Sequence, residues 1–214
     1  MNPAVLQDRI YWGANVAARQ LGALTDAYRP MGNVDPLALI HRYLRLPAAF
    51  TGPEGKFIHP NSYGSALSYG IFDAAYTRVG DYLVQGHSIW FIAAQQPLLP
   101  VLCVKTNRFV SFSRAVAPSA TGVNTYGGVT AATTTPLLTS WPANVLGASG
   151  GGRPEADLPS DNTVPYWTIL LPAIPNVVLR TADLMVDDLG RNAVVAAVEL
   201  SELGWRLTVK QATT

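Results

Sequence analysis

The sequence predicts a mainly β protein made of two small β-barrel or β-sandwich units, preceded by an N-terminal amphipathic helix. Helical periodicity is confined to the start of the chain, and after Pro36 the apolar segments are short and interrupted by turn residues. The chain has 18 glycines and 16 prolines, and many short strands separated by turns are typical of sandwiches and barrels. A strand–turn–strand pattern that occurs twice indicates two such units.

The repeated pattern covers residues 78–94 and 180–198. Each copy has an arginine, an aspartate three residues later, a valine three residues after that, a polar turn with glycine, and an apolar strand. The residues are Arg78, Asp81, Val84 and Gly86 in the first copy, and Arg180, Asp183, Val186 and Gly190 in the second. The second turn is two residues longer. We interpret the repeat as a duplicated supersecondary unit; the alternative is convergence of two hairpins on one turn chemistry.

The N-terminal helix is predicted from its ends and its apolar face. Asn2 is a suitable N-cap with Pro3 at the first helical position, and Gly22 and Pro30 mark the end. Apolar residues recur at steps of three and four, with small residues in the middle: Leu6, Ile10, Ala14, Ala17, Leu21 and Leu24. This face either packs on its own domain or docks as an arm on a neighbouring subunit, and the sequence leaves both open.

The remaining elements are predicted as short strands. Residues 37–50 begin a strand-like alternation, 63–76 are aromatic-rich, and 82–84 and 88–94 form a hairpin. Further strands are expected at 98–105, 109–113, 164–171, 177–180, 184–186, 193–200 and 205–211. The predicted domain organisation is a helical arm (1–30), a first β-barrel-like unit (31–118), Gly/Thr/Ala-rich connecting loops (119–163), and the core strands of a second β-barrel-like unit (164–214).

The composition favours a subunit that buries much of its surface against other chains. Charged residues make up only 14% of the chain, against about 25% in an average soluble domain. A net charge of +1 gives no strong basic field of the kind that attracts nucleic acids. Cys103 is the single cysteine, so no intrachain disulfide forms, and its apolar neighbours predict a buried thiol. We expect no signal peptide and no membrane span.

No residue pattern predicts catalysis, a cofactor or a metal. Residues 147–151 have the letters of a nucleophile elbow, but Arg153 and Pro154 follow and cannot start the required helix. Residues 52–56 lack the spacing of a phosphate-binding loop. His41, His59 and His87 lie in unrelated contexts without ligand spacing. The sequence therefore predicts a protein that is not an enzyme.

The acidic pair and the tryptophans are also interpreted structurally. Asp187 and Asp188 could hold a cation, but between two strands they more economically supply turn hydrogen bonds. The five tryptophans are too evenly spread for a sugar-binding platform, and those on strands are predicted to be core residues.

Two parts of the chain resemble small β-barrel proteins of the tailed-bacteriophage head–tail junction, known as neck, connector or head-closure proteins. The first runs from Gly80-Asp-Tyr-Leu-Val84 through Ile89-Trp-Phe-Ile-Ala93. The second runs from the strand ending in Leu170-Leu-Pro172, through Leu179-Arg-Thr-Ala-Asp183 and Asp187-Asp-Leu-Gly190, to Trp205–Gln211. The likeness is clearest over 80–113 and 164–211. The helix and residues 93–100 also look like prophage proteins encoded among virion structural genes.

The resemblance implies a virion protein, assembled in the bacterial cytoplasm, that forms a homo-oligomeric ring. Its partners would be portal or adaptor and tail proteins, and genomic DNA would pass through the channel without sequence readout. The implied ring contacts are the turn residues Gln85, Gly86, His87, Asp187, Asp188 and Gly190, with Leu6, Ile10, Ala14 and Ala17 of the helix. The loops 119–136 and 147–162 would order only in the assembly.

Two alternative functions stay open. One is a tail-terminator, tail or baseplate component of the same kind of particle. The other, from a different class, is a β-sandwich module that binds carbohydrate or a host surface through exposed aromatic residues such as Tyr63, Tyr69 and Trp141.

Overall fold

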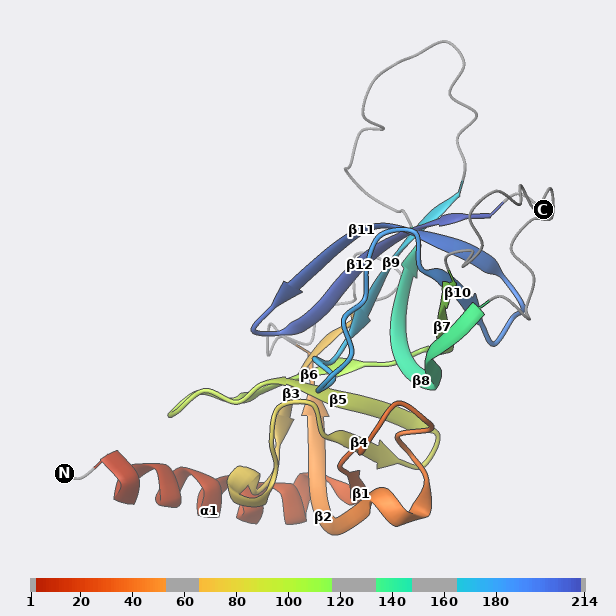
Figure 1. Cartoon of the computed structure of the whole chain (residues 1–214). Helices are drawn as coiled ribbons and strands as arrows, with labels where there is room; N and C mark the ends of the chain where they lie inside the picture. Colours follow the sequence, from red (N-terminus) through yellow and green to blue (C-terminus); the bar gives the residue numbers. More distant parts are fainter. Residues whose placement is uncertain (1–2, 53–65, 117–133, 148–164, 213–214) are drawn as a thin grey trace, which may run out of the picture.

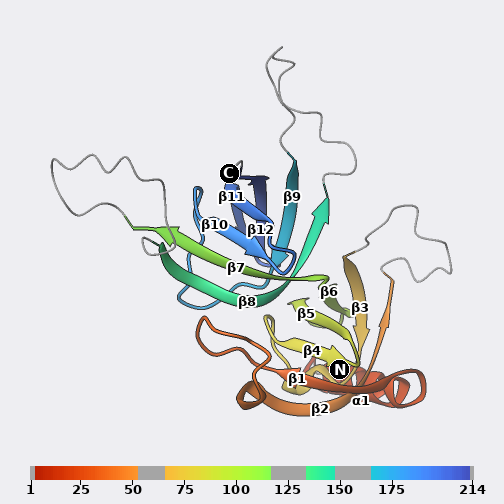
Figure 2. The same ribbon diagram turned by 90° about the vertical axis from the view of Figure 1, so that its right-hand side faces the viewer.

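The structure is a computed structural model that describes residues 3–52, 66–116, 134–147 and 165–212. These residues form one long helix and two closed six-stranded β-barrels, which confirms the predicted mainly β fold with two β units (Figure 1). The barrels are stacked, and the helix lies on the side of the first barrel that faces away from the second (Figure 2).

The first barrel is an antiparallel meander with one crossover. Its strand order is β1–β2–β3–β6–β5–β4, and β4 pairs with β1 to close it. The strands are β1 (Ala23–Tyr28), β2 (Arg42–Thr51), β3 (Leu67–Ile71), β4 (Tyr82–Gln85), β5 (Ser88–Ala94) and β6 (Val101–Lys105). Two short 3₁₀ helices lie in its connections, η1 (Leu39–His41) and η2 (Ala74–Tyr76).

The second barrel repeats this order with every strand number raised by six. It runs β7–β8–β9–β12–β11–β10, and β10 pairs with β7. The strands are β7 (Arg108–Ala115), β8 (Thr134–Gly147), β9 (Tyr166–Leu171), β10 (Leu184–Asp187), β11 (Asn192–Ser201) and β12 (Gly204–Gln211). The predicted hairpins 82–94 and 184–200 are therefore the same element, β4–β5 and β10–β11, of one repeated fold.

Local irregularities are repeated as well. The pairing of β5 with β6 shifts register between Ile92 and Ala94, and that of β11 with β12 shifts between Val195 and Ala197. A proline followed by alanine occupies the same register in β2 and β8: Pro47 lies opposite Leu24, and Pro142 lies opposite Phe109. Bulges and strand prolines are position-specific features of a sheet, so their recurrence supports the duplication.

The helix α1 (Pro3–Leu21) packs on its own barrel, against β2, β3 and η2. Ala18 is fully buried, Tyr11 packs on the barrel core, and a side chain at Gly22 would overlap the carbonyl group of Ala48. The docked face of the helix therefore packs on its own domain, which is the first of the two roles left open by the sequence. The docked face is centred on Tyr11 and Ala18, whereas the predicted face contained Ile10 and Ala17. The predicted face is therefore shifted by one residue along the helix.

The predicted apolar face lies at the edge of this contact. Leu6, Ala14 and Ala17 are half-buried, whereas Ile10, Leu21 and Leu24 are exposed. Leu24 belongs to β1 and not to the helix.

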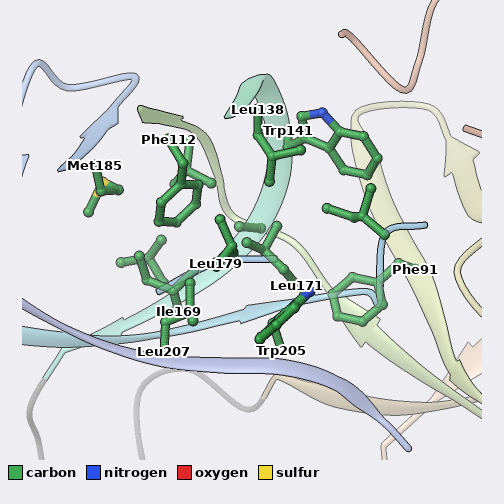
Figure 3. Packing of buried hydrophobic residues seen from close by; sticks show 14 of the residues in the cluster. Phe91, Phe112, Leu138, Trp141, Ile169, Leu171, Leu179, Met185, Trp205 and Leu207 are labelled. Atoms are coloured by element: carbon green, nitrogen blue, oxygen red, sulfur yellow. The ribbon is translucent and has the colours of Figure 1, made fainter. Parts of the chain in front are cut away.

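The cores of the two barrels meet across the strands β4, β5 and β6. Inside the first barrel lie Leu83, Trp90, Ile92 and Cys103. Alternate residues point to the opposite face of a strand, and there Tyr82, Phe91, Ala93 and Val104 join the hydrophobic core of the second barrel. Figure 3 shows Phe91 beside Leu171 and Trp205 in this shared core.

Hydrogen bonds reinforce the junction. The Tyr82 hydroxyl donates to the Pro142 carbonyl at 2.8 Å, and Asn144 Nδ2 donates to the Lys105 carbonyl at 2.7 Å. Trp141 Nε1 donates to the carbonyl of Asn33, which precedes β2, at 3.1 Å. The barrels are therefore packed as one unit.

The structure moves the predicted domain boundaries. β1 lies within the predicted arm 1–30, and β7 lies within the predicted first unit 31–118 although it belongs to the second barrel. β8 lies within the predicted loops 119–163, and the parts of those loops at 119–133 and 148–163 are outside the described residues. Residues 177–180 are coil instead of a strand.

Candidate assembly surfaces

The repeated aspartate is the centre of a buried corner in the first barrel. Asp81 is 2% exposed, and its carboxylate accepts hydrogen bonds from Arg29 Nε at 2.9 Å and Nη2 at 2.8 Å. It also accepts from the Tyr43 hydroxyl at 2.6 Å and from the backbone N–H of Arg78 at 2.9 Å. Arg29 in addition donates to the Tyr76 carbonyl at 3.1 Å. One carboxylate therefore joins β1, β2 and the turn that enters β4.

The second barrel has the same corner around Asp183. Its carboxylate accepts from Arg114 Nε at 2.7 Å and Nη2 at 2.9 Å, and from the N–H of Arg180 at 2.7 Å. Arg114 also donates to the Val178 carbonyl at 2.8 Å. Each arginine thus contacts the carbonyl five residues before its aspartate. The repeated Arg78 and Arg180 contribute their backbone, and a different arginine supplies the charge.

Bidentate charge-assisted hydrogen bonds are among the stronger polar interactions in proteins, so the corners fix where each hairpin leaves its barrel. The hydrogen bond with Asp81 raises the pKa of Arg29, and that with Asp183 raises the pKa of Arg114. Burial, followed by the bond to Asp81, raises the pKa of the Tyr43 hydroxyl. These groups are structural supports for the hairpins.

The β4–β5 tip contains three of the predicted contact residues. The side chain of Gln85 is hydrogen-bonded within the barrel. Its Nε2 donates to Ala23 O at 3.1 Å, to Thr25 Oγ1 at 3.0 Å and to Ala48 O at 2.8 Å. Gly86 and His87 are exposed, and Gly86 has φ = 59°, which suits a two-residue hairpin turn. The tip therefore presents Gly86 and His87, while Gln85 anchors it.

The β10–β11 tip is organised by Asp187, at the position equivalent to Gln85. Its Oδ1 accepts from the N–H groups of Leu189 at 3.0 Å and Arg191 at 2.9 Å, and its Oδ2 accepts from Arg191 Nε at 2.6 Å. Burial raises the pKa of this carboxyl, but the bonds from Arg191 and Leu189 outweigh it and hold the pKa below its usual value. The prediction that this aspartate supplies turn hydrogen bonds is confirmed.

Asp188, Leu189 and Gly190 remain at the surface of this tip. Asp188 lies 3.9 Å from Arg108, and Arg191 stacks over Trp167 with 4.8 Å to the ring centroid. A contact role for Asp188 and Gly190, as for Gly86 and His87, stays a prediction.

The side of α1 turned away from the barrel is an exposed stripe that the sequence interpretation missed. It follows steps of four and three residues and consists of Val5, Arg9, Trp12, Val16 and Arg19, all exposed. Trp12 is 70% exposed. The signal was present in the sequence as a second apolar periodicity, but it is hidden because the helix has apolar residues on several sides. Below, this set is called the α1 stripe.

The described residues also bear on three other kinds of site: a metal site, a reactive cysteine and a glycan-binding surface. Among the described residues, no group of three or more His, Cys, Asp or Glu side chains is placed to hold a metal ion. Cys103 is buried, and burial raises the pKa of its thiol. Trp90 and Trp205 are buried, as predicted for tryptophans on strands, and Trp167 on β9 is half-buried. Trp141 is also buried, so it is wrong as an exposed candidate for glycan binding. Tyr69 is half-buried, and Tyr63 and His59 lie outside the described residues.

Within the described part of the chain, no helix is long and apolar enough to cross a membrane. Comparison with known proteins gives no significant match to a family model, to a curated protein or to a solved structure.

Proposed function

We propose that this chain is a structural protein of a tailed-bacteriophage virion that forms an oligomeric ring in the head–tail connector, joining head to tail around the DNA channel. The observation that carries the proposal is the exposed apolar surface of a subunit with only 14% charged residues, above all the α1 stripe with its exposed Trp12. Contiguous exposed apolar residues rimmed by polar ones mark protein–protein interfaces, and tryptophan is enriched at their energetic centres.

The packing of the barrels and the fixed hairpins also support a structural role in an assembly. The outer face of β4–β6 packs into the core of the second barrel, and the buried Asp81 and Asp183 corners hold two hairpins in fixed directions. Subunits with exposed apolar faces suit closed rings, in which each copy contacts two neighbours. The sequence resemblance to neck proteins is the reason for proposing this ring over other assemblies.

The proposal is tested by imaging. Electron microscopy of the purified chain is expected to show rings with a central channel, and cryo-electron microscopy of virions is expected to place the two-barrel subunit between head and tail. Density found only on the capsid exterior would exclude the proposal. A position further along the tail or in the baseplate would transfer the ring to the tail-terminator, tail or baseplate alternative.

A further inference from the structure

The second exposed apolar feature of the described residues is a groove between the two barrels. Its volume is about 480 Å³, in the range of pockets that enclose drug-sized ligands. One wall comes from the outer face of the first barrel, including Leu67, Leu102 and Val104, and the other comes from β9 and the β11–β12 hairpin, including Leu203 and Trp205. A smaller hollow of about 200 Å³ shares Leu102 and Leu203 with it, so the two form one apolar trough.

The charges at the groove are mainly acidic. Glu199 and Glu202 line it together with one basic residue, Arg206, whose Nη1 lies 4.0 Å from Glu199. The α1 stripe has the complementary character, because it combines the apolar residues Val5, Trp12 and Val16 with the basic residues Arg9 and Arg19. Asp8 is the single acidic residue of the helix.

We infer that the α1 stripe of one copy docks in the inter-barrel groove of the next copy, and that this contact builds the ring. The inference rests on the proposed function, which it deepens by naming the two surfaces. Trp12, Val5 and Val16 cover the apolar trough, while Arg9 and Arg19 face Glu199 and Glu202. From Val5 to Arg19 the stripe is about 21 Å long, so its side chains can contact the groove at several points along one line.

The two surfaces lie on different parts of the same molecule. The helix that carries the α1 stripe lies on the side of the first barrel that faces away from the second barrel (Figures 1 and 2). The groove is lined by residues of both barrels. A contact between two different patches is head-to-tail, and it generates a closed ring when the rotation between copies closes. The same stripe and groove are therefore used by every copy.

The first test measures assembly of the full chain by sedimentation velocity across a concentration series. Trp12→Glu and Leu203→Glu are each expected to raise the concentration for half-assembly by at least about thirty-fold, as removal of a hot-spot residue does. The matched controls are Leu21→Glu, on another side of the same helix, and Leu200→Glu, on the same hairpin but outside the groove. Leu21 is 73% and Leu200 56% exposed, against 70% for Trp12 and 47% for Leu203, and both controls are expected to assemble as the wild type does.

The second test reverses the charges. Arg9→Glu/Arg19→Glu and Glu199→Lys/Glu202→Lys are each expected to assemble poorly alone, because each brings like charges together. Mixed in equal amounts they are expected to assemble, since every contact in an alternating ring then pairs opposite charges. Circular dichroism confirms that each variant is folded before assembly is measured.

The outcomes separate this inference from the proposed function. A wild-type chain that stays monomeric at the highest concentration reached overturns both. Rings that persist at wild-type concentrations in Trp12→Glu or in Leu203→Glu overturn only the pairing of stripe and groove, because the ring then uses other surfaces. Two-copy particles restored by the charge mixture would replace the ring with a reciprocal dimer and overturn the head-to-tail contact.

Discussion

The two barrels have the same strand order and the same Arg–Asp corner, but the outer faces of their equivalent hairpin strands differ. In the first barrel this face carries Tyr82, Phe91 and Val104 and is buried under the second barrel. The equivalent positions in the second barrel, judged by strand register, are Leu184, Val194 and Lys210. There the two apolar residues are half-buried and Lys210 is exposed.

The comparison distinguishes residues that the barrel fold itself requires from residues that determine what packs against the outside of the barrel. Asp81 and Asp183, the bulges and the Pro-Ala pairs are common to both copies because the fold requires them. The outward residues have diverged because one copy is covered by a barrel and the other is not. A large aromatic residue marks the covered face, and a lysine marks the open one.

The largest effect is expected where the two barrels pack against each other. Trp141→Ala removes a fully buried indole and its bond to Asn33, and it is expected to lower the free energy of unfolding by about 4 kcal/mol. Because the outer face of β4–β6 is buried in the core of the second barrel, we expect wild-type urea denaturation, followed by circular dichroism, to be a single transition. Two separate wild-type transitions would show that the barrels are independent. The exposed Leu21→Ala, outside the α1 stripe, serves as the control, with a change within about 0.5 kcal/mol.

The corners should differ by one hydrogen bond. Asp81→Ala is expected to cost about 3 kcal/mol and Asp183→Ala about 2 kcal/mol, because Asp81 alone also accepts the Tyr43 hydroxyl. Tyr43→Phe should cost about 1 kcal/mol in the wild type and nothing in Asp81→Ala. Chemical denaturation of the four proteins of this cycle measures the coupling. Equal losses for the two aspartates would contradict the extra bond.

The β10–β11 tip should give a pH-dependent contribution. The folded-state pKa of Asp187 lies below the usual value of 3.8, so the folded chain binds this proton less readily than the unfolded chain does. Its contribution is therefore complete above the unfolded pKa and is lost as the pH falls through the folded one. Asp187→Asn is expected to cost about 1.5 kcal/mol at pH 7, with the difference from wild type shrinking below pH 3.8. Thermal melts across pH measure this; a difference that grows on acidification would reverse the sign.

The two hairpins could be predicted from the sequence, whereas several other strands could not. The spacing of Arg78, Asp81 and Gly86 is local, and so is the alternation of the last strand, and both predicted real elements. β1 was hidden because Leu24 continues the apolar spacing of the helix. β8 was hidden because it begins in the Thr- and Ala-rich run and contains Pro136 and Pro142, and prolines argue against a strand.

The partners of the corners could not be predicted locally. Arg29 is 52 residues from Asp81, and Arg114 is 69 residues from Asp183. Both pairs form only when the barrel closes, by pairing of β1 with β4 and of β7 with β10. The same holds for the inter-barrel groove, whose walls are brought together by tertiary packing.

At the hairpin tips, anchoring residues should be distinguishable from exposed ones. Gln85→Ala removes the amide that bridges β1 and β2, and it is expected to cost about 1 kcal/mol. His87→Ala, two residues away and exposed, is expected to change stability by less than about 0.5 kcal/mol. Differential scanning calorimetry compares the two. A larger loss for His87→Ala than for Gln85→Ala would reverse these roles.

The smallest effect concerns the residue before each corner aspartate. Gly80 has φ = 92° and Ala182 has φ = 68°, so both are in the left-handed region, which favours glycine. Ala182→Gly relieves strain of about 1 kcal/mol but increases the entropy of the unfolded chain, so a net gain of about 0.5 kcal/mol is expected. Gly80→Ala should lose about 0.5 kcal/mol, because the nearest atom to an added Cβ, the Ala173 carbonyl oxygen, would lie 3.7 Å away and steric overlap adds nothing. Opposite signs in thermal melts would show that the two turns obey one backbone constraint; the same sign for both would mean that the turns are not equivalent.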